Sequence, residues 1–292
     1  MKPQTSKPGP EDLWTIQRML GWGTTFFTEK GVDSPRLSME WLLSDALGLK
    51  RLDLYVQFDR PLSSAELDRL RPWVKRRAAH EPLQYITGMA DFHKIRVHVD
   101  RSVLIPRPET EELVEILLED HPSGRPLRVL DIGTGSGCIA IALKKARPEW
   151  TVEAVDLSEA ALATARRNAD MNGLDIGFSQ ADFLTGEGMP KGPFDLIVSN
   201  PPYIHNEEAE QMHRQVLDYE PHLALFCDDT DQVYGRLARY AREELYPQGA
   251  LWVELNENRS GFETTAIPEG MERLTRTDTA GKTRFAKLWI TC

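Results

Sequence analysis

The chain has 292 residues, of which 41% are hydrophobic, and it carries a formal net charge of −10. This length and apolar content suit one large or two ordinary globular domains. The N-terminus is polar and no apolar run approaches the ~18 residues of a membrane helix, which argues against export and membrane insertion. The three cysteines have no CxxC spacing, so we expect no metal site and a reducing, cytoplasmic location.

The charge is unevenly distributed along the chain. Residues 1–90 contain 13 Lys and Arg against 11 Asp and Glu, whereas the remaining residues contain 22 against 34, a net charge of −12. A region this acidic opposes binding to a phosphate backbone, although a local basic patch can override net charge. We therefore expect no stable nucleic-acid complex.

The N-terminal part of the chain has a helical pattern. Residues 1–10 form an expected mobile tail, and in residues 11–90 apolar side chains recur at three- and four-residue spacing. Ser34, which precedes a proline, suits a helix start, and Ser63 with Glu66 fits a capping box. These features predict a small all-helical domain.

The last helix of this domain carries a basic cluster. Its members are Arg69, Arg71, Lys75, Arg76 and Arg77. Such a charge run indicates either a contact with an acidic partner or, more commonly, a solvated helix face. The sequence leaves both interpretations open.

A linker separates the helical domain from the rest of the chain. Residues 91–105 alternate apolar and polar side chains, which predicts a short β-hairpin. The rigid sequence IPRPET at residues 105–110 follows, and it suits either the wall of a cleft or a stiff connection. We assign residues 106–292 to a second domain.

Strands and helices alternate in this second domain. Such repetition predicts a doubly wound α/β fold with a mostly parallel sheet. A long polar segment, residues 205–229, interrupts it. The strands are expected at residues 127–132, 151–157, 176–181, 194–199 and 250–255, and as a final pair around Leu274 and residues 285–290. The helices are expected at residues 138–146, 158–172 and 232–245.

A glycine-rich loop follows the first strand. Gly133, Gly135 and Gly137 allow the backbone to approach a ligand at a helix N-terminus. With Ala140, the loop also fits the dinucleotide pattern GxGxx(G/A), so glycines alone would allow NAD. Asp156 ends the second strand, where a carboxylate would accept hydrogen bonds from both ribose hydroxyls of an adenosine.

The remaining strand ends help to choose the cofactor. Asp182 and Phe183 end the third strand and could bind an adenine amino group and ring. Hydride transfer usually requires a proton donor beside the carbonyl, but no histidine ends a strand, and His205 is the nearest. S-adenosylmethionine, which also contains adenosine, is therefore favoured over NAD.

The sequence Asn200-Pro201-Pro202-Tyr203 ends the fourth strand. The Asn200 side-chain oxygen and the Pro201 carbonyl can each accept one N–H of a planar NH2 group, and Tyr203 offers an aromatic face. A proline pair also simply ends a strand, because proline has no N–H for the ladder. The glycine loop and Asp156 favour the functional interpretation.

With these motifs placed, the sequence resembles class I S-adenosylmethionine-dependent methyltransferases, and more closely the bacterial release factor glutamine methyltransferase family, also called HemK or PrmC. The similarity covers nearly the whole chain after the tail. The narrowest matches are LIPRPETEELVE at residues 104–115 and YEPHLAL at residues 219–225. The others are RRAAHEPLQYITG at 76–88, DIGTGSGCIAIAL at 131–143, AVDLS at 154–158, SNPPYI at 199–204 and DTAGKTRF at 278–285.

The resemblance implies a Rossmann-like seven-stranded sheet, a helical substrate-recognition domain, and methylation of the glutamine in the Gly-Gly-Gln motif of class 1 release factors. It assigns catalysis to Asn200, Pro201 and Tyr203, and substrate binding to Asn200, Pro201, Pro202 and Tyr203. The implied cofactor residues are Asp131, Gly133, Thr134, Gly135, Ser136, Gly137, Asp156, Asp182, Phe183 and Asn200. Asp182 and Phe183 lie in the loosest match. We expect a monomer.

Three alternatives remain open. An adenine N6-methyltransferase acting on DNA or RNA could use the same Asn-Pro-Pro-Tyr turn after base flipping. A sister family methylates a glutamine of a ribosomal protein, but tends to vary around IPRPET. A scaffold that binds an adenosine nucleotide without catalysis is the third.

Overall fold

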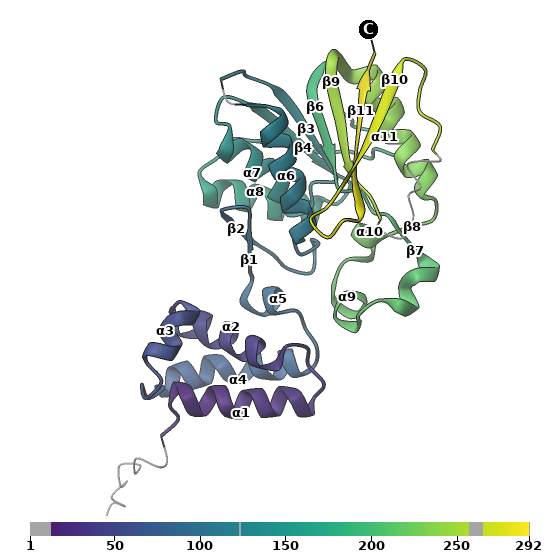
Figure 1. The fold of residues 1–292 in the computed structure, drawn as a ribbon. Helices are drawn as coiled ribbons and strands as arrows, with labels where there is room; N and C mark the ends of the chain where they lie inside the picture. The colour runs from purple at the N-terminus through teal and green to yellow at the C-terminus, as the bar shows by residue number, and fades with distance from the viewer. Residues whose placement is uncertain (1–12, 123, 257–264, 292) are drawn as a thin grey trace, which may run out of the picture. The chain divides into compact units, whose positions relative to one another are not determined.

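The computed structural model describes residues 13–122, 124–256 and 265–291 (Figure 1). The chain divides into two compact units, Met1–Thr87 and Gly88–Cys292. The tail expected at residues 1–10 and the cysteine at position 292 lie outside the described residues.

The first unit is helical. Ser63 begins α4 with a capping box, because its hydroxyl accepts from Glu66 N and the Glu66 carboxylate accepts from Ser63 N at 2.7 Å. Ser34 precedes α2 but makes no capping bond, since its backbone is left-handed (φ 46°) rather than extended. The helices are α1 (Ile16–Glu29), α2 (Pro35–Leu47), α3 (Arg51–Val56), α4 (Ser64–Ala78) and α5 (Leu83–Thr87).

Two arginines of the basic cluster hold this unit together. Arg77 is 5% exposed, and its guanidinium donates to Ser38 Oγ at 3.1 Å and to the Glu81 carbonyl at 3.0 Å. Arg76 donates to both carboxylate oxygens of Glu81 at 2.7 Å and to the Tyr85 carbonyl at 3.0 Å. Arg76 thus binds α5 and the turn before it, and Arg77 binds that turn and α2, so Arg77 is not part of a solvated helix face.

The second unit begins with a hairpin of β1 (Met89–Phe92) and β2 (Ile95–His98). The two turn residues, His93 and Lys94, both have positive φ, which matches the right-handed twist of the paired strands. Asn168 of α8 (Glu159–Asn172) accepts from His98 N and donates to His98 O, so the hairpin is fixed to α8 of the same unit.

The main sheet has seven strands in the order β10-β11-β9-β6-β3-β4-β5. The five strands from β9 to β5 are parallel, and β11 pairs antiparallel with β9 and β10. This confirms the predicted mostly parallel, seven-stranded sheet. The bounds are β3 (Arg128–Ile132), β4 (Thr151–Asp156), β5 (Gly177–Gln180), β6 (Phe194–Ser199), β9 (Leu245–Glu254), β10 (Met271–Thr277) and β11 (Thr283–Ile290).

Helices cover both faces of this sheet. Figure 1 shows α6 (Pro108–Asp120), α7 (Cys138–Ala146) and α8 on one face, and α11 (Thr230–Glu244) on the other. The α11 face forms a core that includes Ile197, Tyr234 and Leu251, each at most 1% exposed. The fold is thus doubly wound, as predicted.

Strand register places the chemistry at one edge. Ile132 of β3 pairs with Val155 of β4 and with Ser199 of β6. Because these strands are parallel, the residues that follow them, Gly133, Asp156 and Asn200, lie at the same carboxyl edge, where ligands bind in open α/β sheets.

The polar segment after Tyr203 contains short elements beside this edge. They are β7 (Ile204–His205), a 3-10 helix η2 (Asn206–Gln211), α9 (Arg214–Tyr219), α10 (His222–Leu225) and β8 (Phe226–Cys227). Among the residues that the structure describes, no helix combines the length and hydrophobicity of a membrane span.

Candidate active site

The glycine loop between β3 and α7 has all three glycines at positive φ, with 73°, 54° and 79° at Gly133, Gly135 and Gly137. A Cβ on either of the first two would meet no atom within 4 Å, whereas a Cβ on Gly137 would lie 3.1 Å from Ala165 Cβ of α8. The first two glycines therefore keep space open for a ligand, and the third allows α7 and α8 to pack closely.

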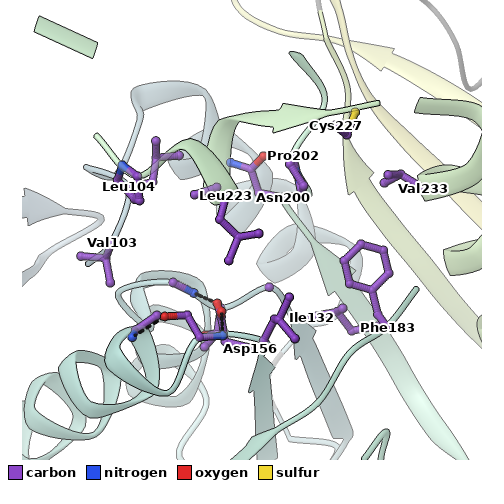
Figure 2. A pocket seen from close by; sticks show the side chains of 18 of the residues that line it. Val103, Leu104, Ile132, Asp156, Phe183, Asn200, Pro202, Leu223, Cys227 and Val233 are labelled. Carbon is purple, nitrogen blue, oxygen red and sulfur yellow. Dashed lines mark hydrogen bonds between the residues drawn. The ribbon is translucent and has the colours of Figure 1, made fainter. Parts of the chain in front are cut away.

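Asp156 is held by the loop that it faces. Its Oδ2 accepts from Gly135 N at 2.8 Å and its Oδ1 accepts from Ser158 N at 2.9 Å (Figure 2). Burial raises the pKa of this carboxyl above its usual value. A carboxylate has about four acceptor positions, so both oxygens keep capacity for further donors such as ribose hydroxyls.

A cavity of about 560 Å³ opens at this edge of the sheet. This volume lies within the range of ~300–1,000 Å³ that is typical of small-molecule sites. Figure 2 shows Asp156 and Asn200 in its wall, with Leu223 of α10 between them in this view. The cavity brings together nine residues named from the sequence: Gly133, Thr134, Gly135, Ser136, Asp156, Asp182, Phe183, Asn200 and Pro202.

Four other residues named from the sequence are not among those that line the cavity: Asp131, Gly137, Pro201 and Tyr203. Asp131 is fully buried and its Oδ2 accepts from Thr134 Oγ1 at 2.6 Å. Burial raises the pKa of Asp131 to about 7. The Asp131 carboxyl thus supports the glycine loop through Thr134.

Buried polar contacts orient the Asn-Pro-Pro-Tyr turn. Asn200 Nδ2 donates to Thr110 Oγ1 at 3.0 Å, and Tyr203 OH donates to Glu254 Oε1 at 3.0 Å. Asn256 Nδ2 donates to the Tyr203 carbonyl at 3.1 Å. The carboxamide of Asn200 and the ring of Tyr203 are therefore both fixed by hydrogen bonds.

Residues 18–88 match the family model of the PrmC N-terminal domain, and residues 109–282 match that of the methyltransferase small domain. The release factor glutamine methyltransferase of Geobacter sulfurreducens is 43% identical, over 92% of this chain and 98% of that protein. The protein of the same name from Leptospira interrogans is 39% identical, over 94% and 98%. The solved structure of TrmN from Thermus thermophilus is 26% identical, with a TM-score of 0.44 over 61% of this chain and 48% of that one.

The chain belongs to the release factor glutamine methyltransferase family. Two of its narrowest sequence motifs meet in the structure of this family member. Arg107 of IPRPET donates to Glu220 of YEPHLAL at 2.7 Å, and the backbone N–H of Ile105 donates to the other Glu220 oxygen at 3.1 Å. The Glu220 side chain is only 1% exposed.

The charge of the cavity is negative in this methyltransferase. Four aspartates line it: Asp156, Asp182, Asp228 and Asp229. Arg107, the arginine in the lining, is paired with Glu220, and His222 is the histidine there. The lining therefore favours a cationic ligand over an anionic one.

Sequence reasoning missed Thr110, Glu220 and Glu254 as individual site residues. Thr110 and Glu220 lie within motifs that the sequence had singled out. Glu254 is a charged residue within the otherwise apolar run at residues 250–255, and its burial at 1% exposure makes it unusual. This single charged residue in an apolar strand was the sequence feature that could have identified Glu254.

Proposed function

We propose that this protein transfers the methyl group of S-adenosylmethionine to the side-chain amide nitrogen of the glutamine in the Gly-Gly-Gln motif of class 1 release factors. One observation carries the proposal: Asn200, whose side chain can orient an amide, lines the same acidic cavity as Asp156. The family of the chain supports the substrate, because the named relatives are release factor glutamine methyltransferases.

The cavity charge supports S-adenosylmethionine as the cofactor. This molecule carries a positive sulfonium and an α-ammonium group, whereas NAD carries a negatively charged diphosphate. Four aspartates beside one neutralised arginine would repel the diphosphate and attract the two cations. The same carboxylates also disfavour a nucleic-acid substrate.

The residues present fit this cofactor. Asp156 would accept from the ribose hydroxyls, the open space at Gly133 and Gly135 would admit the ligand against the loop, and Asp182 with Phe183 would bind the adenine. When bound, S-adenosylmethionine supplies an electrophilic methyl group on a positively charged sulfur.

The protein must make a poor nucleophile react. An amide lone pair is delocalised into its carbonyl, the resonance that gives the peptide bond a rotation barrier of about 18–20 kcal/mol. Asn200 Oδ1 and the Pro201 carbonyl would each accept one N–H of the glutamine, so the lone pair would face the methyl group. Both acceptors also favour the positive charge that develops on nitrogen as the new bond forms. The nitrogen then releases a proton, so no strong base is needed beforehand.

The helical unit, assigned from the sequence to residues 11–90, completes the proposal. Its function would be to bind the release factor, with the hairpin region 91–105 as the link to the catalytic residues 106–292. We further propose a monomer in the cytoplasm, which suits the free thiols of Cys138 and Cys227.

Mass spectrometry of a release factor after reaction with labelled S-adenosylmethionine tests this function. We expect one added methyl on the glutamine of Gly-Gly-Gln, and none when that glutamine is replaced by glutamate. Label in added nucleic acid or in a ribosomal protein, with none in the release factor, would refute the proposal in favour of the other methyltransferase classes.

The variant Asn200→Ala tests the residue at the centre of the proposal. We expect turnover to fall by ~10²-fold or more, because one acceptor for the transition state is lost, while the cofactor product S-adenosylhomocysteine still binds. A protein that only binds adenosine nucleotides would bind S-adenosylhomocysteine equally as wild type and as Asn200→Ala. Neither form would methylate a release factor.

A further inference from the structure

Glu254 is a buried carboxylate at the end of β9. It is 1% exposed, and its neighbours in the strand, Trp252 and Val253, are fully buried. Val253 pairs with Ser199 of β6, so Glu254 and Asn200 leave adjacent parallel strands at the same level. A buried carboxylate is costly unless hydrogen bonds satisfy it. The hydrogen bonds that Glu254 accepts therefore indicate its structural role.

The Glu254 carboxylate receives two hydroxyl donors. Thr110 Oγ1, from α6, donates to Oε2 at 2.7 Å, and Tyr203 OH donates to Oε1 at 3.0 Å. Both donors lie at the cavity end of the sheet, and Tyr203 belongs to the Asn-Pro-Pro-Tyr turn. The carboxylate thus connects α6 to this turn.

The direction of these bonds determines how Asn200 is turned. An ionised carboxylate only accepts, so the single proton of the Thr110 hydroxyl is committed to Glu254. The Thr110 oxygen can then only accept from Asn200, and the Asn200 group at 3.0 Å must be Nδ2 rather than Oδ1. Asn200 Oδ1 is left as an acceptor.

We propose that Glu254 is a positioning residue for methyl transfer, which acts through Thr110 to keep Asn200 Oδ1 available to the substrate amide and which directly holds the ring of Tyr203. This inference rests on the proposed function. It explains why a charged side chain lies within an apolar strand behind a turn that itself contains no ionisable group except Tyr203.

The opposite hydrogen-bond direction shows what would be lost. If Thr110 lost its acceptor in Glu254, its hydroxyl could donate to Asn200 Oδ1, and the carboxamide would rotate. Asn200 would then present N–H groups to the N–H groups of the glutamine, and two donors cannot bond each other. Loss of this acceptor should therefore lower turnover more than it lowers the affinity for the cofactor.

We call the two hydrogen bonds from Asn200 to Thr110 and from Thr110 to Glu254 the relay. The substitution Thr110→Val tests it, because valine keeps the shape of threonine and removes the hydroxyl. Thr110→Ser keeps the hydroxyl, and Thr164→Val is a matched control. Thr164 is also a buried threonine bonded to another hydroxyl, that of Ser102 at 3.1 Å, but it lies outside the relay. All three are made in the full chain.

We expect Thr110→Val to lower kcat on a release factor by ~10²-fold, since misplacement of a reacting group by about 1 Å costs this much. Affinity for S-adenosylhomocysteine, measured by calorimetry, should change by less than about threefold. Thr110→Ser should recover most of the turnover, and Thr164→Val should keep it. The assays are made below the melting temperatures of both variants. Equal kcat in Thr110→Val and Thr164→Val would overturn the proposal.

A second measurement tests the hydrogen bonds of the relay without an activity assay. In nuclear magnetic resonance spectra of ¹⁵N-labelled protein, the Nδ2 hydrogens of Asn200 can be assigned by their loss in Asn200→Asp. We expect one of them to exchange slowly with solvent in the wild type and in Thr110→Ser, and rapidly in Thr110→Val. Slow exchange in Thr110→Val would refute the relay. An inactive wild type with the expected exchange would refute only the proposed function.

Discussion

Arg107 and Glu220 are 113 positions apart in the chain and form an ion pair of 2.7 Å between Nη2 and Oε1. Arg107 precedes α6, and Glu220 precedes α10, so the pair joins two segments that line the cavity. Because the Glu220 side chain is buried, removing its partner would leave an uncompensated charge.

We therefore expect Arg107→Ala to lower the free energy of unfolding by about 2–4 kcal/mol, somewhat below the usual cost of breaking a fully buried pair because Arg107 is 31% exposed. Arg125→Ala is the control, since Arg125 pairs with Asp195 at 3.1 Å but is 69% exposed. Its loss should cost less than about 1 kcal/mol. Urea denaturation measures both, and equal effects would contradict the structural role of Glu220.

The glycine loop gives a prediction that separates binding from folding. Gly135→Ala and Gly137→Ala both force a side chain into left-handed backbone, which costs about 1–2 kcal/mol. Only Gly137→Ala also crowds Ala165, whereas the Gly135 Cβ would enter open space in the cavity. Gly137→Ala should therefore have the lower melting temperature, and Gly135→Ala should lose more affinity for S-adenosylhomocysteine in calorimetry. The reverse order would show that the loop is assigned wrongly.

Asp131 predicts a pH dependence of stability. Burial raises its folded pKa to about 7, well above the ~3.9 of an unfolded aspartate, so the folded state holds the proton more tightly. Stability from this group is present below pH ~4 and is lost as pH rises toward 7. Thermal unfolding should show Asp131→Asn gaining more relative to wild type at pH 8 than at pH 5.

Asp120 is the control of opposite sign for that measurement. Burial would raise the pKa of Asp120, but Lys287 at 2.9 Å and Arg276 at 3.2 Å hold it below its usual value. Its stabilisation is present above the unfolded pKa and is lost as pH falls through the folded one. Asp120→Asn should therefore be less stable than the wild type by the same amount at pH 5 and at pH 8. A gain at pH 8 from this substitution would invalidate the comparison.

Glu254 predicts how turnover depends on pH. Burial raises its pKa to about 7, so acidification below this value would protonate the acceptor of Thr110. We expect kcat to fall as pH drops through about 7, and Glu254→Gln to remove this step. The groups that interact with the carboxyl are Glu109 and Thr110 of α6, Tyr203, Tyr234 of α11, Arg284 of β11 and Cys138 of α7. An unchanged profile in Glu254→Gln would show that Glu254 is not the group whose protonation lowers kcat.

The fold was largely predictable from the sequence. Buried parallel strands have nearly continuous apolar runs, so β3 and β6 were predicted to within one residue. The family resemblance implied that Gly133, Asp156 and Asn200 bind one cofactor, and all three line one cavity.

The polar network could not be predicted in the same way. Thr110 and Glu254 are 144 positions apart, and periodicity indicates which face of an element is buried rather than which side chains meet. The short elements α9 and α10 have six and four residues, too few for a periodic pattern. Arg77 was assigned to a charged surface because its burial depends on the packing of α2 and α4.

The order of the strands has a consequence for how the molecule behaves at high concentration. Exposed sheet edges invite pairing with a second chain, and short or charged edge strands prevent it. One edge here is β5, which has only four residues, and the other is β10, which carries Glu272 and Arg273 on exposed positions. Neither edge offers a long apolar template, so the sheet should resist edge-to-edge aggregation.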